Sequence, residues 1–415
     1  MAGDDAKYLR GRRPRANHRG NETVRLVDLF SGIGGLTLGV EEACRQLALG
    51  LEVRLAVECN AEIARAYADN FLPSNGAATD VSQWFDRSPS ESLSTCERKT
   101  RATVGVVDIL VGGPPCQGHS TLNNYTRGDD PKNELYHAVI RAAEVLEPDC
   151  VLIENVPAIE RDARGTLARA TERLLRLGYL VDSAVVCVSD IGVPQLRSRH
   201  VLAARRRIAP SIVAALQAVR ARAQRTVRWA IEDLVDVRPR GILDDAAGLS
   251  RENQRRAEFL IAHDQFDLPN RLRPKCQRGP HKYKSMYGRL AWDAPAQTIT
   301  TGFGSPGQGR YFHPSRPRAL TPHEAARLQF LPDWLDLRSI VHRKKLAAAI
   351  GNAVPPKLAF AIAASLLDTR RARAASLEPK PNAPNTLLQW SSRVFPSPSA
   401  TSDRQSLGHA ASSKT

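Results

Sequence analysis

The sequence predicts an α/β fold built on an open sheet of parallel strands. Short apolar runs, among them "RLVDLF", "VRLAVE", "VVDILVGG" and "CVLIENV", each precede a segment of helical periodicity such as "NAEIARAYADNF". Strands that alternate with helices of ten or more residues are typical of parallel strands joined by crossover helices. The chain has 415 residues, of which 42% are hydrophobic, so it can bury a large core and form more than one domain.

Changes of composition along the chain predict four parts. Residues 1–22 are polar and arginine-rich, and residues 371–415 are rich in serine, proline and alanine, so both ends are predicted to be disordered tails. The strand–helix alternation covers 23–206, fades over 207–342, and gives way to a core-like helical pattern over 343–370. We therefore predict a large domain from 23–206 plus 343–370 and a smaller, irregular domain from 207–342.

The charge of the chain predicts a polyanionic partner. The formal net charge is +16 and the pI is about 9.9, and the segment 271–289 carries seven Lys or Arg residues, two tyrosines and no acid. A basic surface gains affinity for phosphate through counterion release, so nucleic acid is the leading candidate. An arginine-rich surface without a partner is the alternative that charge alone leaves open.

The seven cysteines predict reduced thiols and no metal site. They contain no CxxC pair and no Cys/His cluster at the spacing of metal ligands. No apolar run approaches the ~20 residues of a membrane span, and the N-terminus lacks the apolar core of a secretory signal. These features predict a cytoplasmic protein without metal or membrane association.

Four polar or glycine-rich stretches follow predicted strands directly: "DLFSGIGG", "ECN", "GGPPCQG" and "ENVP". In open α/β sheets the ligand site lies at the carboxyl ends of the strands. We therefore expect these four stretches to share one site at that edge of the sheet, called the rim below.

The glycine turn "LFSGIGGLTLG" (29–39) is the candidate cofactor loop. Its glycines allow a ligand to approach the backbone closely, but nicotinamide, flavin and S-adenosylmethionine sites all use such turns. The spacing departs from G-x-G-x-x-G. Glu58, at the end of the second strand, is placed to accept hydrogen bonds from ribose hydroxyls.

Cys116 in "GGPPCQG" is the candidate nucleophile. Two glycines and two prolines before it would hold the thiol in one geometry, and a thiolate is a strong nucleophile. The alternative is a buried structural cysteine. Glu154 in "ENVP" could deliver a proton in the same cleft, or serve only as a cap or ion-pair partner. Arg197 and Arg199 are alternate residues that would point the same way from a strand, towards an anionic or carbonyl-bearing ligand or towards solvent.

Together these stretches resemble the DNA (cytosine-5) methyltransferases of the bacterial restriction-modification type, in that family's motif order from residue 24 to about 366. "GGPPCQGHS" is similar to the nucleophile motif, "ENV" to the motif that protonates cytosine, and "QLRSR" to the arginine motif. "RALTPHEAARLQFLPD" (318–333) and "AIGNAVPPKLAFAIAASL" (349–366) are similar to the last two motifs. The resemblance implies a Rossmann-like sheet for S-adenosylmethionine and a small target-recognition domain. The segment near 86–103 and much of 207–287 fall outside it.

The resemblance also implies a set of cofactor contacts. Phe30 would stack on adenine, the Ser31–Gly35 backbone would hold the methionine part, Glu58 the ribose, and Asp80 the adenine amino group. The complete implied set is Phe30, Ser31, Gly32, Ile33, Gly34, Gly35, Glu58, Cys59, Asp80, Val81, Pro115, Leu135, Asn352, Ala353 and Val354.

The implied reaction is methylation of carbon 5 of a cytosine flipped out of duplex DNA. Cys116 would add to carbon 6 of the ring, Glu154 would relieve the charge at nitrogen 3, Arg199 would hold the exocyclic oxygen, and Arg197 would fix the site. The residues expected to contact DNA are Gln117, Ser120, Arg273, Lys275, Lys282 and Lys284.

Two departures and several alternatives accompany the resemblance. His119 stands where the family usually has phenylalanine, and Leu36 replaces a common aromatic residue. A tRNA-methylating relative would carry a Cys-Phe-Thr signature, which this sequence lacks. A catalytically inactive DNA-binding relative is a second alternative. The resemblance implies a monomer that acts in the bacterial cytoplasm, with or without a separate cognate restriction endonuclease.

Overall fold

The computed structural model describes residues 4–14, 22–115, 135–239, 241–278 and 285–368, all within the unit Met1–Ala375. Five of the predicted site residues lie outside the described residues: Cys116, Gln117, Ser120, Lys282 and Lys284. The predicted C-terminal tail, residues 371–415, lies outside them as well.

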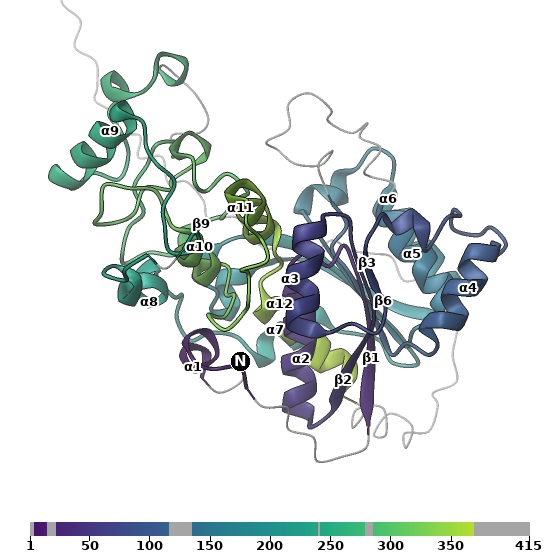
Figure 1. The fold of residues 1–415 in the computed structure, drawn as a ribbon. Helices are drawn as coiled ribbons and strands as arrows, with labels where there is room; N and C mark the ends of the chain where they lie inside the picture. Colours follow the sequence, from purple (N-terminus) through teal and green to yellow (C-terminus); the bar gives the residue numbers. More distant parts are fainter. Residues whose placement is uncertain (1–3, 15–21, 116–134, 240, 279–284, 369–415) are drawn as a thin grey trace, which may run out of the picture. The chain divides into compact units, whose positions relative to one another are not determined.

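A seven-stranded sheet forms the centre of the fold (Figure 1), with strand order β3-β2-β1-β4-β5-β8-β6. The predicted α/β class is confirmed. The strands are β1 (Thr23–Leu29), β2 (Gly50–Glu58), β3 (Gly76–Ala78), β4 (Ile109–Gly112), β5 (Cys150–Asn155), β6 (Tyr179–Cys187) and β8 (Ser198–Arg206). β1 to β5 pair in parallel, as the alternation predicted.

β8 differs from the parallel prediction, because it runs antiparallel to both of its neighbours, β5 and β6. The link from β6 to β8 holds only a short 3-10 helix, η4 (Val188–Ile191), and the two-residue strand β7 (Gln195–Leu196). A parallel pair needs a crossover of a dozen or more residues, whereas a short connection returns the chain in the opposite direction.

Helices cover both faces of the sheet, because the buried strands are apolar on both sides. In β1, Leu26 packs with one core and Val27 and Leu29 with the other. Figure 1 places these helices on either side of the sheet. One face carries α2 (Gly35–Leu47), α3 (Ala61–Phe71), α7 (Ile212–Ala218) and α12 (Pro356–Leu367), and the other α4 (Thr95–Val104), α5 (Leu135–Leu146) and α6 (Thr166–Arg176).

Residues 207–342, called the irregular region below, contain few long elements. Beyond α7, the described residues of this region hold helices α8 (Val227–Ile231), α9 (Arg251–Ala262) and α10 (Pro322–Leu328), four one-turn 3-10 helices, and the strand β9 (Ala296–Gln297), which pairs with β7. α11 (Arg343–Asn352) follows. Much of the region packs in an apolar cluster that includes Ile231, Phe303 and Leu328 and extends to Leu38 on α2 and Ile63 on α3.

Residues 4–14, which belong to the predicted disordered tail 1–22, are ordered. Asp5–Arg10 forms helix α1, which Asp4 caps by accepting hydrogen bonds from the backbone N–H groups of residues 6 and 7. Tyr8 is 5% exposed and Leu9 is fully buried. Two apolar residues in a polar stretch give no periodic signal, so composition alone predicted disorder here.

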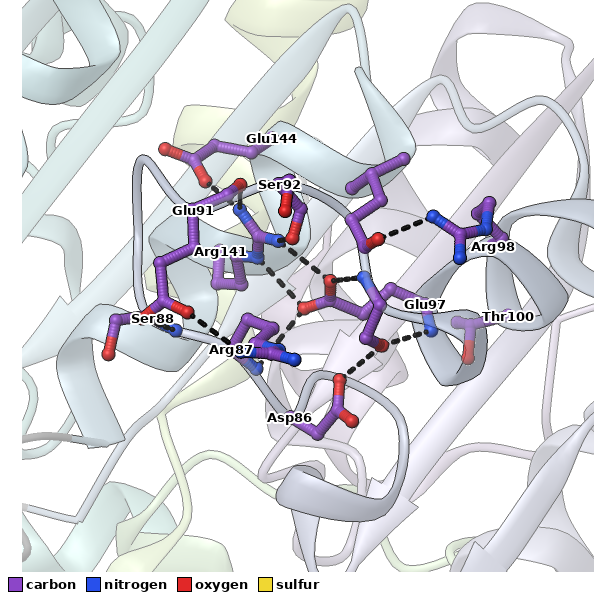
Figure 2. Close-up of polar contacts among 12 residues, drawn as sticks. Asp86, Arg87, Ser88, Glu91, Ser92, Glu97, Arg98, Thr100, Arg141 and Glu144 are labelled. Atoms are coloured by element: carbon purple, nitrogen blue, oxygen red, sulfur yellow. Dashed lines mark hydrogen bonds and ion pairs between the residues drawn. The ribbon is translucent and has the colours of Figure 1, made fainter.

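α4 belongs to the segment that the family resemblance did not cover, and a buried ionic cluster joins it to α5 (Figure 2). Arg141 donates to Glu97 (Nη2–Oε2 2.7 Å) and to Glu144 (Nη1–Oε2 2.7 Å), and the three side chains are at most 5% exposed. Ser94 and Glu97 also form a capping box at the start of α4. This segment is therefore an ordered part of the sheet's helical layer.

Within the described residues, no single helix meets the length and apolarity needed to cross a membrane; only α11 and α12 taken together, bent by 41°, pass that test. Almost all of α12 is buried against the rest of the protein.

Candidate active site

The rim brings the ends of β1, β2, β4 and β5 together, as the strand order requires. Ser31 N–H donates to the carbonyl of Val57 (3.0 Å), and Gly113 N–H donates to that of Leu29 (3.3 Å). The Gly32 N–H donates to the Glu58 carboxylate (3.2 Å). The glycine turn and the acid after β2, predicted to share one site, therefore do so.

The glycine turn is held in an unusual backbone conformation by close packing. Phe30, Gly32 and Gly34 all have positive φ values, of 59°, 53° and 83°. A Cβ atom on Gly34 would lie 2.2 Å from the ring of Phe71, and one on Gly35 would lie 2.2 Å from the carbonyl oxygen of Val354. A positive φ in a phenylalanine costs energy, which the close packing around the turn must offset.

The turn has space for a ligand and a hydroxyl group that could form a hydrogen bond with one. The Ser31 hydroxyl is buried, and no group in the described part of the chain bonds to it. Apart from its two chain neighbours, no described residue has a heavy atom within 4 Å of a Cβ position on Gly32. A cavity of about 480 Å³ adjoins the turn and has Ser31 and Glu58 in its lining. Buried polar groups are nearly always bonded, so an unbonded hydroxyl indicates a missing partner.

The other predicted cofactor residues lie around this turn or near it. Glu58 also accepts from the Asn60 N–H (2.9 Å) and from the exposed Cys59 thiol (3.6 Å). Asp80 caps a 3-10 turn by accepting from the Ser82 N–H (2.9 Å), and this hydrogen bond lowers the pKa of Asp80. Val81 is buried. Leu135 begins α5 and is half-buried, like Pro115; Asn352 is exposed, whereas Ala353 and Val354 are buried.

Gly113, at the exit of β4, lies where the helix after the glycine turn approaches Glu154. A Cβ placed there would lie 3.8 Å from Val354, 3.9 Å from Leu36 and 4.0 Å from Glu154 Oε2. Pro114, the next residue, accepts a hydrogen bond from the Asn155 side chain (3.3 Å). This anchors the described end of the Cys116 segment beside β5, although Cys116 itself lies outside the described residues.

Glu154 and Arg199 form an ion pair across β5 and β8. Arg199 Nε lies 2.8 Å from Glu154 Oε1, and the two side chains are 14% and 11% exposed. The antiparallel course of β8 makes this possible, since it brings the start of β8 to the rim where β5 ends. The prediction that both residues enter one cleft is consistent with this pair, and their catalytic roles stay predictions.

Arg197 does not lie on one strand with Arg199, so the expected alternation of the two side chains does not apply. It is 2% exposed, and its Nη1 donates to the carbonyls of Ile299 (2.9 Å) and Gly351 (3.2 Å). The reason is that the predicted strand is broken: residues 195–196 form β7 with β9, and β8 begins only at Ser198. Arg197 thus joins β7 to the irregular region and α11, a positioning contact.

The predicted DNA contacts divide into three groups. The prediction for Arg273 is wrong, because this residue does not lie on the surface. It is only 5% exposed and donates to the carbonyl of Leu268 (3.0 Å). Lys275 is exposed, as a phosphate contact requires. The remaining four residues lie outside the described part. Among the described residues, no group of three or more His, Cys, Asp or Glu could hold a metal ion.

A buried polar triad beneath the glycine turn was missed by the sequence analysis. Thr37 donates to Asp28 (Oγ1–Oδ2 2.7 Å) and contacts the Tyr67 hydroxyl (2.7 Å). Burial raises the pKa of Asp28 to about 7. The triad ties β1 to α2 and α3 behind the turn. The sequence signal that could have revealed this triad is Asp28 itself, a charged residue inside the apolar run "RLVDLF".

His200 is a second buried group without an assigned role. It follows Arg199 on β8 and pairs in register with Asn155. It is fully buried, neither ring nitrogen has a hydrogen-bond partner in the described part of the chain, and burial lowers its pKa to about 4.

This burial predicts acid sensitivity that depends on His200. As the pH falls from about 6.5 towards 4, the unfolded chain binds a proton here that the folded chain does not, so the free energy of unfolding decreases. Between pH 7.5 and pH 5, the wild type should lose about 2 kcal/mol of its free energy of unfolding through His200. We expect this part of the loss to be absent in His200→Phe. Urea unfolding at the two pH values measures this, with exposed His263→Gln as control. Equal pH dependence in wild type and His200→Phe would contradict it.

Comparison with known proteins adds three findings. A family model described as "C-5 cytosine-specific DNA methylase" matches residues 24–368. The chain is 39% identical over 360 residues to "Type II methyltransferase M1.BsuMI" of Bacillus subtilis, covering 86% of this chain and 84% of that protein. It is 31% identical over 352 residues to "Type II methylase M.HgiDII" of Herpetosiphon aurantiacus, covering 82% and 94%.

Solved structures share the fold. A putative DNA modification methyltransferase encoded within a prophage of E. coli superposes with a TM-score of 0.59 at 24% identity, covering 84% of this chain and 99% of that one. The S. pombe Dnmt2 methyltransferase superposes with a TM-score of 0.57 at 17% identity, with the same coverage.

Proposed function

The chain belongs to the C-5 cytosine-specific DNA methylases, and from this premise we propose how its residues perform methyl transfer to DNA. The observation that carries the proposal is the Arg199–Glu154 ion pair at the rim, beside the β4 exit that leads to Cys116. The methyl donor of the family is S-adenosylmethionine, so the site must hold a cofactor and a cytosine together.

The glycine turn fits the donor. Among the described residues, Ser31 supplies a buried hydroxyl without a hydrogen-bond partner and Gly32 supplies open space, and Glu58 supplies a carboxylate for ribose hydroxyls. Phe30, Asp80 and Val81 would contact the adenine, and residues 352–354 would close the pocket from α11. When bound, S-adenosylmethionine supplies an electrophilic methyl group on a sulfonium ion.

The Ser31 hydroxyl gives a direct test of this cofactor assignment. We expect Ser31→Ala to raise the dissociation constant for S-adenosylmethionine about tenfold, because a hydrogen bond to a charged group contributes about 1.5–3 kcal/mol. Isothermal titration calorimetry measures the constant. Ser74→Ala, whose hydroxyl donates to Glu52 outside the turn, is the control. Unchanged affinity in Ser31→Ala would contradict the assignment.

The cytosine is activated by residues of the chain. Cys116 as thiolate adds to carbon 6, and the displaced electron pair makes carbon 5 nucleophilic. Glu154 holds a proton at ring nitrogen 3, which relieves the negative charge, and Arg199 binds the exocyclic oxygen. Arg197 positions this arrangement through the carbonyls of Ile299 and Gly351. Once carbon 5 carries the methyl group, loss of the carbon 5 proton and expulsion of the thiolate complete the reaction.

The DNA must present the base outside the helix, because neither ring face is accessible in a stacked duplex. The net charge of +16 supports phosphate contacts, and Lys275, Lys282 and Lys284 are proposed to make them. Gln117 and Ser120 are proposed to contact DNA near the flipped base. The irregular region would read the sequence.

The biological setting we propose is a bacterial restriction-modification system, in which methylation protects host DNA in the cytoplasm. Support comes from relatives whose names call them Type II methyltransferases. A separate cognate endonuclease and a monomeric enzyme complete the proposal. Bisulfite sequencing of DNA from expressing and non-expressing cells tests it and would identify the methylated sequence.

Transfer of labelled methyl groups from S-adenosylmethionine to duplex DNA and to tRNA transcripts tests the substrate class. We expect label in DNA at cytosine carbon 5 and none in tRNA. Label confined to tRNA would contradict the proposal, and absence of label in both would favour an inactive DNA-binding relative.

A further inference from the structure

Residues 4–14, called the N-terminal clasp below, contact both the sheet's helices and the irregular region. Figure 1 shows α1 near α8, α7 and α2. The Leu9 carbonyl accepts a hydrogen bond from the Asp333 N–H (2.9 Å). The clasp therefore contacts a segment that lies more than 300 residues further along the chain.

Asp5 is the buried centre of the clasp. Its carboxylate, 6% exposed, pairs with Arg225 (Oδ2–Nη2 2.6 Å) and with Lys357. Lys357 lies on α12 and is 4% exposed, whereas Arg225 precedes α8 in the irregular region. Burial lowers the pKa of Lys357 and of Arg225, and the negative charge of Asp5 opposes this shift in both.

An aromatic stack continues the contact. Tyr8 stacks on Phe330 with ring centroids 5.7 Å apart, and Phe330 stacks on Trp229 at 6.3 Å. Arg10 lies over the Trp229 ring at 5.2 Å and pairs with Asp233 at 3.4 Å. Trp229 and Asp233 belong to the first part of the irregular region and Phe330 to its last part.

Arg13 anchors the other end of the clasp on the sheet's helices. It donates to the Asn70 carbonyl (2.6 Å) at the end of α3 and to Glu41 (2.8 Å) on α2. Its guanidinium lies over the rings of Trp334 (5.0 Å) and Phe71 (5.5 Å). Arg12, its exposed neighbour, makes none of these contacts.

We propose that the N-terminal clasp positions the irregular region for DNA, by fixing both ends of that region, near 225–233 and 330–334, to α2, α3 and α12. Asp5 and Arg13 are its positioning residues. The inference rests on the proposed function, because it assumes that the irregular region contacts DNA while the rim holds the cofactor. Loosening the clasp would leave the cofactor site intact and misplace the DNA-binding surface relative to Glu154 and Arg199.

Two matched pairs of variants test the clasp, and within each pair both variants remove the same charge. Asp5→Asn is compared with Asp4→Asn, which keeps a capping side chain, and Arg13→Ala is compared with Arg12→Ala. The readouts are kcat and KM for duplex DNA, normalised to active sites by burst titration, together with the dissociation constant for S-adenosylmethionine. Arg13 is 38% exposed, so its variant tests the clasp even if Asp5→Asn does not fold.

We expect Asp5→Asn and Arg13→Ala to raise KM for DNA at least fivefold, while cofactor affinity and both controls stay within twofold of wild type. A fall only in the active fraction, with KM and kcat per active site unchanged, would overturn the proposal, since it would indicate a purely structural role. Equal effects in test and control variants would also overturn it. Failure of the proposed function is distinguishable, because wild type itself would then transfer no methyl groups.

Discussion

Replacing Cys116 with serine is expected to reduce methyl transfer by at least about 10⁴-fold while cofactor binding is retained. A serine hydroxyl is far less ionised than a thiol near neutral pH and adds poorly to carbon 6. Carbon 5 would then lack the electron density to accept a methyl group. Single-turnover transfer to duplex DNA measures the loss, and calorimetry measures cofactor affinity.

A second cysteine provides the control for this variant. Cys96→Ser changes a thiol that donates to the Gln83 carbonyl, a hydrogen bond that a serine hydroxyl can also donate, so this variant should retain full activity. Substantial turnover by Cys116→Ser would contradict the role of the thiol, and loss of cofactor binding would indicate misfolding of the rim instead.

Glu154→Gln is expected to lower kcat about 10³-fold, within the range that general acid–base catalysis contributes. Glutamine keeps the shape of the side chain but cannot exchange a proton with ring nitrogen 3, and it leaves Arg199 without its ionic partner. KM for DNA should change much less than kcat, because the interaction develops as the ring gains charge.

Glu160→Gln is the matched control, since it removes the same charge from an exposed residue six positions along the chain. We expect it to behave as wild type. A kcat for Glu154→Gln within threefold of wild type would mean that Glu154 serves only as an ion-pair partner of Arg199.

The rim could be predicted because its signals are local. Each strand end is followed at once by the residues that reach the site, as in "DLFSGIGG" and "ENVP", and parallel pairing brings those ends together. The hydrogen bond from Gly32 to Glu58 and the proximity of Gly113 to Glu154 follow from that topology.

The other features depend on contacts between distant parts of the chain. Arg197 turns to carbonyls 102 and 154 residues away, which no strand pattern announces. The clasp forms because Asp5 meets Lys357, a contact across 352 residues. Arg273, in the most basic segment, folds back on the Leu268 carbonyl. Composition describes such segments as polar and cannot say which of their charges are buried.

The proposed mechanism requires that a thiolate at residue 116 adds covalently to the target cytosine. Duplex DNA with 5-fluorocytosine at the methylated position, incubated with the enzyme and S-adenosylmethionine, tests it most directly, because fluorine at carbon 5 cannot leave as a proton does. We expect a denaturation-resistant adduct whose peptide mass maps to Cys116. An enzyme that methylates normal DNA but forms no adduct, or forms one at another residue, would contradict it.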